Sequence, residues 1–254
     1  MDDIVVLEWT FSPPEYFEEV ITVECESYTF IIDNGKVEAR IDPAAYDKEH
    51  KMRNKLHDEL NDRFMGVQLL AYEPYSLSKA SMYLLHANGQ RDITIFPDSI
   101  VMKISVDTID TVYKDKDGNI VSDSRRDRIE KKKKLAELVA KHRSKDKTLE
   151  SILGFYKAAI YDPYNELVHL FDIWEALEKR FIKKKAALTT LAISESEYKK
   201  LGNPANNDPF IGRHRGKKVG VSRGATEAEL EEARGIARNM IEVYLHYLES
   251  QNTP

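Results

Sequence analysis

A chain of 254 residues can bury a sizeable core, either as one large domain or as two of ordinary size. Its 38 basic and 43 acidic residues leave a net charge of −5, which excludes a protein that coats nucleic acid with its whole surface but allows local basic patches. The single cysteine, Cys25, excludes an intramolecular disulfide framework and a structural zinc site built on cysteines. No apolar run approaches the ~20 residues that span a bilayer, so we expect a soluble, cytoplasmic protein with no membrane partner.

The N-terminal part of the chain, from Ile4 to Val121, is typical of short β-strands because it is rich in β-branched and aromatic residues. Asp33-Asn34-Gly35 predicts a tight hairpin turn, since Asn and Gly accept the positive φ that such a turn requires. One helix is predicted over 47–64, where large apolar residues recur every four positions. The predicted strands are 20–23, 28–32, 36–41, 67–72, 81–85, 92–96 and 100–106, with a hairpin over 111–121.

Two segments of this part have a competing interpretation. The alternating Asp residues of 114–119 resemble the start of a calcium loop, but the carboxylates stop too soon and no Glu closes the coordination shell. A plain hairpin turn is therefore favoured there. The aromatic and proline residues from Trp9 to Pro14 are compatible with a peptide-binding groove, and a strand running into a loop is the favoured interpretation.

The pattern changes after residue 122, where helical periodicity replaces the strands. Residues 125–142 contain a run of four lysines, Lys131 to Lys134, beside a narrow apolar stripe, which predicts a charged helix. Such a helix usually connects two parts of a protein and is solvated. The alternative is a phosphate-binding face, because clustered Lys and Arg serve either role.

The C-terminal part predicts a bundle of four to five helices. Apolar spacing indicates a helix over 149–160, ended by Asp162-Pro163, and a longer one over 164–185. Capping boxes at Ser194/Glu197 and Thr226/Glu229 open a short helix over 195–201 and the last helix of the chain. We therefore predict an α+β protein with a β-rich domain over 1–121, a charged linking helix over 122–145 and a helical bundle over 146–254.

The candidate site is the cationic segment, Arg213-His214-Arg215-Gly216-Lys217-Lys218, between the last two predicted helices. Its permanent charges on Arg213, Arg215, Lys217 and Lys218 would attract phosphate, and its glycine lets a ligand approach the backbone closely. His214 is the one group in it that can transfer a proton near neutral pH. The alternative is a connection that is merely solvated.

Several segments, taken in order, resemble the HEPN superfamily, particularly its Apea-like and abortive-infection branches, over roughly 146–250. The resemblance implies a four- to five-helix bundle, often a homodimer, of the kind found in antiviral defence, toxin–antitoxin pairs and RNA processing. Many members are metal-independent endoribonucleases. The segments that carry it are Asp162-Pro163, Leu170-Phe171-Asp172-Ile173-Trp174-Glu175-Ala176-Leu177-Glu178, Tyr198-Lys199-Lys200-Leu201, Ala205-Asn206-Asn207, the cationic segment and Ala225-Thr226-Glu227-Ala228-Glu229.

The catalytic motif of that superfamily is an Arg, a polar residue and a His four to six residues beyond the Arg. Arg213 matches the Arg, His214 matches the polar position, and Glu178 matches a supporting acid on an earlier helix. Where the motif's His would fall, this chain has Lys217, Lys218, Val219 and Gly220. The chain therefore departs from the motif at the residue that moves the proton.

Cleavage by such a site would proceed by attack of an RNA 2′-hydroxyl on the adjacent phosphorus. Arg213 and Lys218 would neutralise the phosphorane and His214 would have to transfer the proton. Because a lysine with a pKa near ~10.4 is a poor general base, we favour binding of RNA or of a nucleotide phosphate over catalysis. A metal-independent endoribonuclease and a structural scaffold are the alternatives.

The expected partners follow from the same interpretation. The resemblance implies a homodimer formed through the bundle, with RNA or a nucleotide as ligand. The β-rich domain would contact a target or a protein partner. No metal and no cofactor is expected, because the histidines show no metal-ligand spacing.

Overall fold

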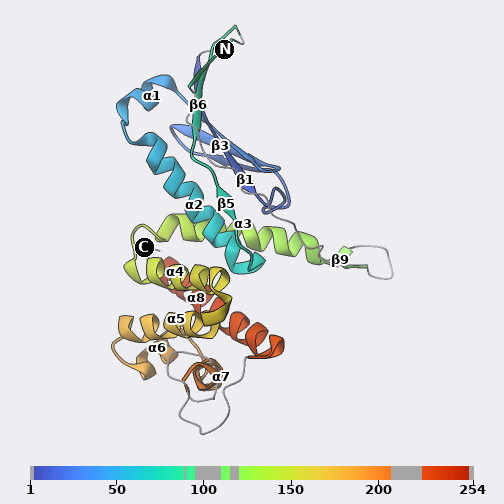
Figure 1. The fold of residues 1–254 in the computed structure, drawn as a ribbon, viewed down its shortest axis with the longest axis vertical. Helices are drawn as coiled ribbons and strands as arrows, with labels where there is room; N and C mark the ends of the chain where they lie inside the picture. Colours follow the sequence, from blue (N-terminus) through green and yellow to red (C-terminus); the bar gives the residue numbers. More distant parts are fainter. Residues whose placement is uncertain (1–2, 89, 95–109, 115–119, 207–224, 252–254) are drawn as a thin grey trace. The chain divides into compact units, whose positions relative to one another are not determined.

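The computed structural model describes residues 3–88, 90–94, 110–114, 120–206 and 225–251. The chain divides into two compact units. Unit 1 comprises Met1–Val67 and Tyr75–Ala136, and unit 2 comprises Gln68–Pro74 and Glu137–Pro254. The predicted α+β class is confirmed, with an antiparallel sheet in the N-terminal part and several helices in the C-terminal part (Figure 1). The finer domain ranges, 1–121, 122–145 and 146–254, stay a prediction.

Unit 1 is built on an antiparallel sheet in which the described strands follow the order β2-β3-β4-β1-β6-β7, with β5 pairing to the end of β1. A separate ribbon pairs β8 with β9. The strands are β1 (Ile4–Ser12), β2 (Ile21–Glu24), β3 (Tyr28–Asp33), β4 (Lys36–Ile41), β5 (Ser76–Leu77), β6 (Ser81–Leu85), β7 (Arg91–Thr94), β8 (Val112–Lys114) and β9 (Ile120–Asp123).

The strand predictions that rest on local patterns are confirmed. Strands β2, β3, β4 and β6 lie within a residue of the predicted ranges, and β7 and the β8–β9 hairpin lie at the predicted places. The turn between β3 and β4 has φ of 39° at Asn34 and 81° at Gly35, as the residue types require. The strand predicted over 100–106 lies outside the described residues.

Helix α2 (Met52–Ala71) supplies the apolar partner of the sheet in unit 1 (Figure 1). The indole Nε1 of Trp9 on β1 donates to Nδ1 of His57 at 3.2 Å, and the rings of Phe11 and Phe64 meet edge to face at 5.1 Å. Trp9 and Phe64 are fully buried. Aromatic residues on one face of β1 and one face of α2 therefore form the core of unit 1.

The single helix predicted over 47–64 is instead two helices. The first, α1 (Pro43–Lys48), begins with a proline, and its N-cap Asp42 accepts a hydrogen bond from the backbone of Ala45 at 3.0 Å. The second, α2, continues through the segment predicted as strand 67–72. That prediction is wrong because Val67, Gln68 and Leu69 are all buried, and a short run buried on every side has no periodicity that separates helix from strand.

Helix α3 (Ser124–His142) confirms the predicted charged helix, but its lysine run is not simply solvated. Lys132 is buried and its Nζ lies 3.1 Å from the backbone oxygen of Tyr16 and 2.6 Å from a carboxylate oxygen of Glu18. Arg128 also binds Glu18, at 2.6 Å, and Lys133 pairs with Glu19. These cations hold the loop after β1 and are engaged with protein carboxylates, which weakens the alternative of a phosphate-binding face.

Unit 2 is a helical bundle around α5, which contacts α4, α6, α7 and α8 (Figure 1). Trp174 of α5, Tyr156 of α4 and Tyr244 of α8 are almost completely buried and fill its core. The described elements are α4 (Lys147–Tyr161), the 3-10 turn η1 (Pro163–Asn165), α5 (Glu166–Arg180), α6 (Lys184–Thr190), α7 (Glu195–Asn206) and α8 (Glu227–Gln251).

Both predicted capping boxes are confirmed. The backbone N–H of Glu197 donates to Ser194 Oγ at 3.1 Å, and that of Glu229 donates to Thr226 Oγ1 at 3.3 Å. The helix predicted over 164–185 is shorter, since η1 precedes α5 and α5 ends at Arg180. It ends there because Ile182 has a φ of 68°, which no α-helix contains.

Candidate phosphate-binding site

The residues predicted for phosphate binding lie outside the described part of the chain. Arg213, His214, Arg215, Lys217 and Lys218 all fall between the end of α7 and the start of α8 in the sequence. Nothing in the structure therefore places them relative to one another. The two helices that flank the cationic segment are described, and they constrain its surroundings.

The flanking helices α7 and α8 both pack on α5 and are tied to each other. Lys200 of α7 pairs with Glu232 of α8 at 2.7 Å, and Asn239 of α8 donates to Glu197 of α7 at 3.1 Å. The cationic segment therefore connects two helices that are held side by side in unit 2.

Three of the four glutamates in the first turns of α8 already have partners. Glu227 pairs with Arg234, Glu229 closes the capping box, and Glu232 pairs with Lys200. Glu231 is exposed. The described carboxylates at the start of α8, which follow the cationic segment in sequence, are thus largely compensated by groups outside it.

The predicted supporting acid, Glu178, lies on α5 and has a structural contact. Its Oε2 accepts a hydrogen bond from the indole Nε1 of Trp174, one turn earlier, at 3.0 Å. The Trp174 ring lies 5.0 Å from that of Tyr198, and Lys184 Nζ lies 3.7 Å from the centre of the Tyr198 ring. The hydrogen bond that orients the buried indole is a structural role for the Glu178 carboxylate. The role of Glu178 as a supporting acid stays a prediction.

A large groove among the described residues of unit 2 lies between α4 and α5. Its volume is about 650 Å³, within the roughly 300 to 1,000 Å³ that small-molecule ligands occupy. It combines three cations, two hydroxyls, two carboxylates and one aromatic ring. The lining residues are Lys147, Thr148, Ser151, Phe155, Asp172, Glu175, Ala176, Lys179 and Arg180.

The cations of this α4–α5 groove are positioned by the ends of the two helices. Lys147 begins α4, and its Nζ lies 2.8 Å from a carboxylate oxygen of Glu150. Lys179 and Arg180 lie in the last turn of α5, where positive charges interact favourably with the helix dipole. A hydrogen bond with Tyr244 raises the pKa of Arg180, and the Tyr244 hydroxyl lies 3.1 Å from Asp146, the N-cap of α4. One end of the groove is thus built on a hydrogen-bonded network.

This arrangement suits a nucleotide. Lysine and arginine side chains bind phosphate, and a half-buried ring such as Phe155 offers a face to a base. Carboxylates such as those of Asp172 and Glu175 are acceptors for ribose hydroxyls. The sequence contains no signal for this groove, because its residues come from two helices and form no motif. Lys179 and Arg180 are also explained by the helix dipole alone.

Ile182, next to the groove residues in sequence, has a conformation that its side chain disfavours. It follows the α5 C-cap with φ of 68° and is 86% exposed, at a position where glycine is usual. We expect Ile182→Gly to raise the free energy of unfolding by about 0.5 to 1 kcal/mol, because the left-handed conformation no longer crowds a Cβ. Urea denaturation measures this. Ile182→Ala keeps the Cβ and should change little, and equal stabilisation by both variants would contradict the explanation.

Comparison of the chain with protein-family models, with curated proteins and with solved structures gives no match. Within the described residues, no helix is long and apolar enough to cross a membrane. The same residues contain no group of three or more His, Cys, Asp or Glu side chains arranged to hold a metal ion.

Proposed function

We propose that unit 2 is a HEPN-like module that binds the phosphates of RNA or of a nucleotide without the ribonuclease chemistry of that superfamily. The observation that carries this proposal is the cationic segment, whose four permanent charges come shortly before the start of α8, where most carboxylates are already paired. The departure from the motif at Lys218 argues for binding rather than cleavage.

The α4–α5 groove supports the same function from described residues. It is large enough for a nucleotide and presents Lys147, Lys179 and Arg180 beside the ring of Phe155. In this proposal the cationic segment contacts the RNA backbone and the groove receives one nucleotide. The protein acts as a cytoplasmic homodimer in prokaryotic defence or stress response, the setting that the HEPN resemblance implies.

Binding is expected to be salt-dependent through the cationic segment. We expect a labelled single-stranded RNA to bind the full chain at low salt, with log Kd changing linearly with log salt concentration. Arg213→Ala/Arg215→Ala/Lys217→Ala/Lys218→Ala should lower the slope by up to about 3, since each lost phosphate contact contributes about 0.7 for a single strand. Fluorescence anisotropy over a salt series measures both quantities. Lys147→Ala/Lys179→Ala tests the groove and should weaken binding further.

The matched control removes four positive charges from exposed residues of unit 1, in Lys48→Ala/Lys51→Ala/Lys55→Ala/Arg126→Ala. It should leave the slope nearly unchanged. If the control lowered the slope as much as the variant of the cationic segment does, only the net charge of the protein would matter. Absence of RNA binding at low salt would favour the structural scaffold. Metal-independent cleavage to a cyclic phosphate, abolished by Arg213→Ala and His214→Ala, would replace binding with the endoribonuclease alternative.

A further inference from the structure

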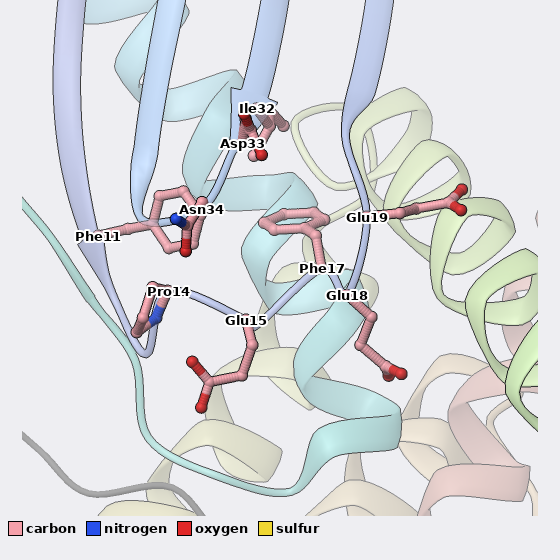
Figure 2. A pocket seen from close by; sticks show the side chains of 9 residues that line it. All are labelled: Phe11, Pro14, Glu15, Phe17, Glu18, Glu19, Ile32, Asp33 and Asn34. Carbon is pink, nitrogen blue, oxygen red and sulfur yellow. The ribbon is translucent and has the colours of Figure 1, made fainter. Parts of the chain in front are cut away.

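A small pocket in unit 1 lies between the β3–β4 turn and the loop that follows β1 (Figure 2). The backbone N–H of Phe11 donates to the oxygen of Gly35 at 2.8 Å, which ties the two segments together. A Cβ added at Gly35 would lie 3.1 Å from Pro14 Cβ and 3.3 Å from the oxygen of Phe11. The rim is therefore closely packed and held in place.

The floor of this Phe17 pocket is apolar. Phe11 and Phe17 meet edge to face with their ring centres 6.0 Å apart, and Ile32 of β3 completes the lining. All three side chains are buried. The pocket holds about 160 Å³, well below the roughly 300 Å³ at which pockets for whole small molecules begin. Its size suits one side chain.

The rim of the Phe17 pocket is acidic, and its four carboxylates are of two kinds. Glu18 and Glu19 are engaged by Arg128, Lys132 and Lys133 of α3. Burial raises the pKa of Glu18, but the hydrogen bonds from Arg128 and Lys132 outweigh it and hold that pKa below its usual value. Figure 2 shows the Glu19 carboxylate directed toward a helix and away from the ring of Phe11.

Glu15 and Asp33 are the other two carboxylates. Both are exposed, and neither side chain has a hydrogen bond or an ion pair among the described residues. They leave two uncompensated negative charges at the mouth of an apolar pocket. A cation is the complementary ligand, and the apolar floor below the two carboxylates favours an organic cation over a hydrated metal ion.

We propose that the Phe17 pocket receives an arginine side chain of a partner protein. The side chain would lie across the mouth, with its methylenes over Phe11 and Phe17 and its planar guanidinium on Glu15 and Asp33. Arginine in a preformed pocket is a common anchor of protein interfaces. The pocket belongs to unit 1, and its occupancy does not depend on phosphate binding by unit 2.

N-acetyl-arginine amide is the probe, titrated into the isotope-labelled full chain and followed by the backbone amide resonances of the non-proline residues within 11–19 and 32–35. We expect saturable shifts confined to these residues. N-acetyl-citrulline amide, which has nearly the same shape without the charge, should bind at least about tenfold more weakly. N-acetyl-lysine amide should also bind more weakly than the arginine probe, because it lacks the planar fork.

Glu15→Gln/Asp33→Asn should weaken binding of the arginine probe about tenfold or more. The matched control, Glu24→Gln/Glu26→Gln, removes two exposed carboxylates from the same unit without touching the pocket. It should bind like the unmodified chain. The proposal would be overturned if the citrulline probe bound as well as the arginine probe, or if the lysine probe bound more tightly. It would also be overturned if the pocket variant bound the arginine probe as well as the unmodified chain does, or if the shifts spread over the chain without saturation.

Discussion

Gly66→Ala is expected to lower the free energy of unfolding by about 3 kcal/mol or more. Gly66 lies in α2, and a Cβ built on it would come within 2.5 Å of Ala136 Cα, 2.6 Å of the Leu135 oxygen and 2.7 Å of the Ala136 nitrogen. All three atoms belong to the backbone of α3, so no side-chain rotation can relieve the overlap. One of the two helices must move, and the contact between them inside unit 1 must open.

Urea denaturation followed by circular dichroism measures this effect. Two other helical glycines provide the control, because a Cβ at Gly154 or Gly235 would meet nothing within 4 Å. Gly154→Ala and Gly235→Ala should each raise stability by about 0.5 to 1 kcal/mol, through the better helix propensity of alanine. If Gly66→Ala were as stable as these variants, α2 and α3 would not approach closely at this position.

The parts of the fold that could be predicted are those set by neighbouring residues. The Asn34-Gly35 turn depends on the residues within it, and the boxes at Ser194 and Thr226 need only a glutamate three positions later. The end of α2 depends on its burial, which a local pattern does not contain. The close approach of Gly66 to α3 could not be predicted either, because its partners follow about seventy positions later.

The candidate sites divide in the same way. The cationic segment is a local charge pattern and was found from the sequence. The α4–α5 groove joins Lys147 to Lys179, and the Phe17 pocket joins Phe11 to Asp33, so neither has a local signal. The residues from Trp9 to Pro14 are compatible with a peptide-binding groove, but their pattern favours a strand running into a loop. The structure confirms that β1 ends at Ser12, and the loop after it is one wall of the Phe17 pocket.

Glu166→Ala is the second substitution with a large expected effect, a loss of about 3 kcal/mol or more. The Glu166 side chain is only 4% exposed. Its carboxylate accepts hydrogen bonds from Arg234 at 2.6 and 3.0 Å and from the Tyr72 hydroxyl at 2.7 Å. The guanidinium of Arg234 also lies 4.8 Å from the centre of the Tyr72 ring. Burial and the hydrogen bond to Glu166 raise the pKa of Tyr72. Removing Glu166 leaves a partly buried arginine with one outer partner, Glu227.

The physical cause is the desolvation of Arg234, and a double-mutant cycle isolates it. Glu166→Met/Arg234→Met removes both charges and keeps apolar volume, so it should cost much less than Glu166→Met alone. With Arg234→Met as the other single variant, the coupling between the two sites should be about 1 to 3 kcal/mol. The exposed pair Arg126–Glu130 on α3 is the control, and Glu130→Ala should change stability by no more than about 0.5 kcal/mol. Denaturant midpoints measure all of these variants. If the double variant lost as much stability as Glu166→Met alone, an unpaired Arg234 charge would not explain the loss.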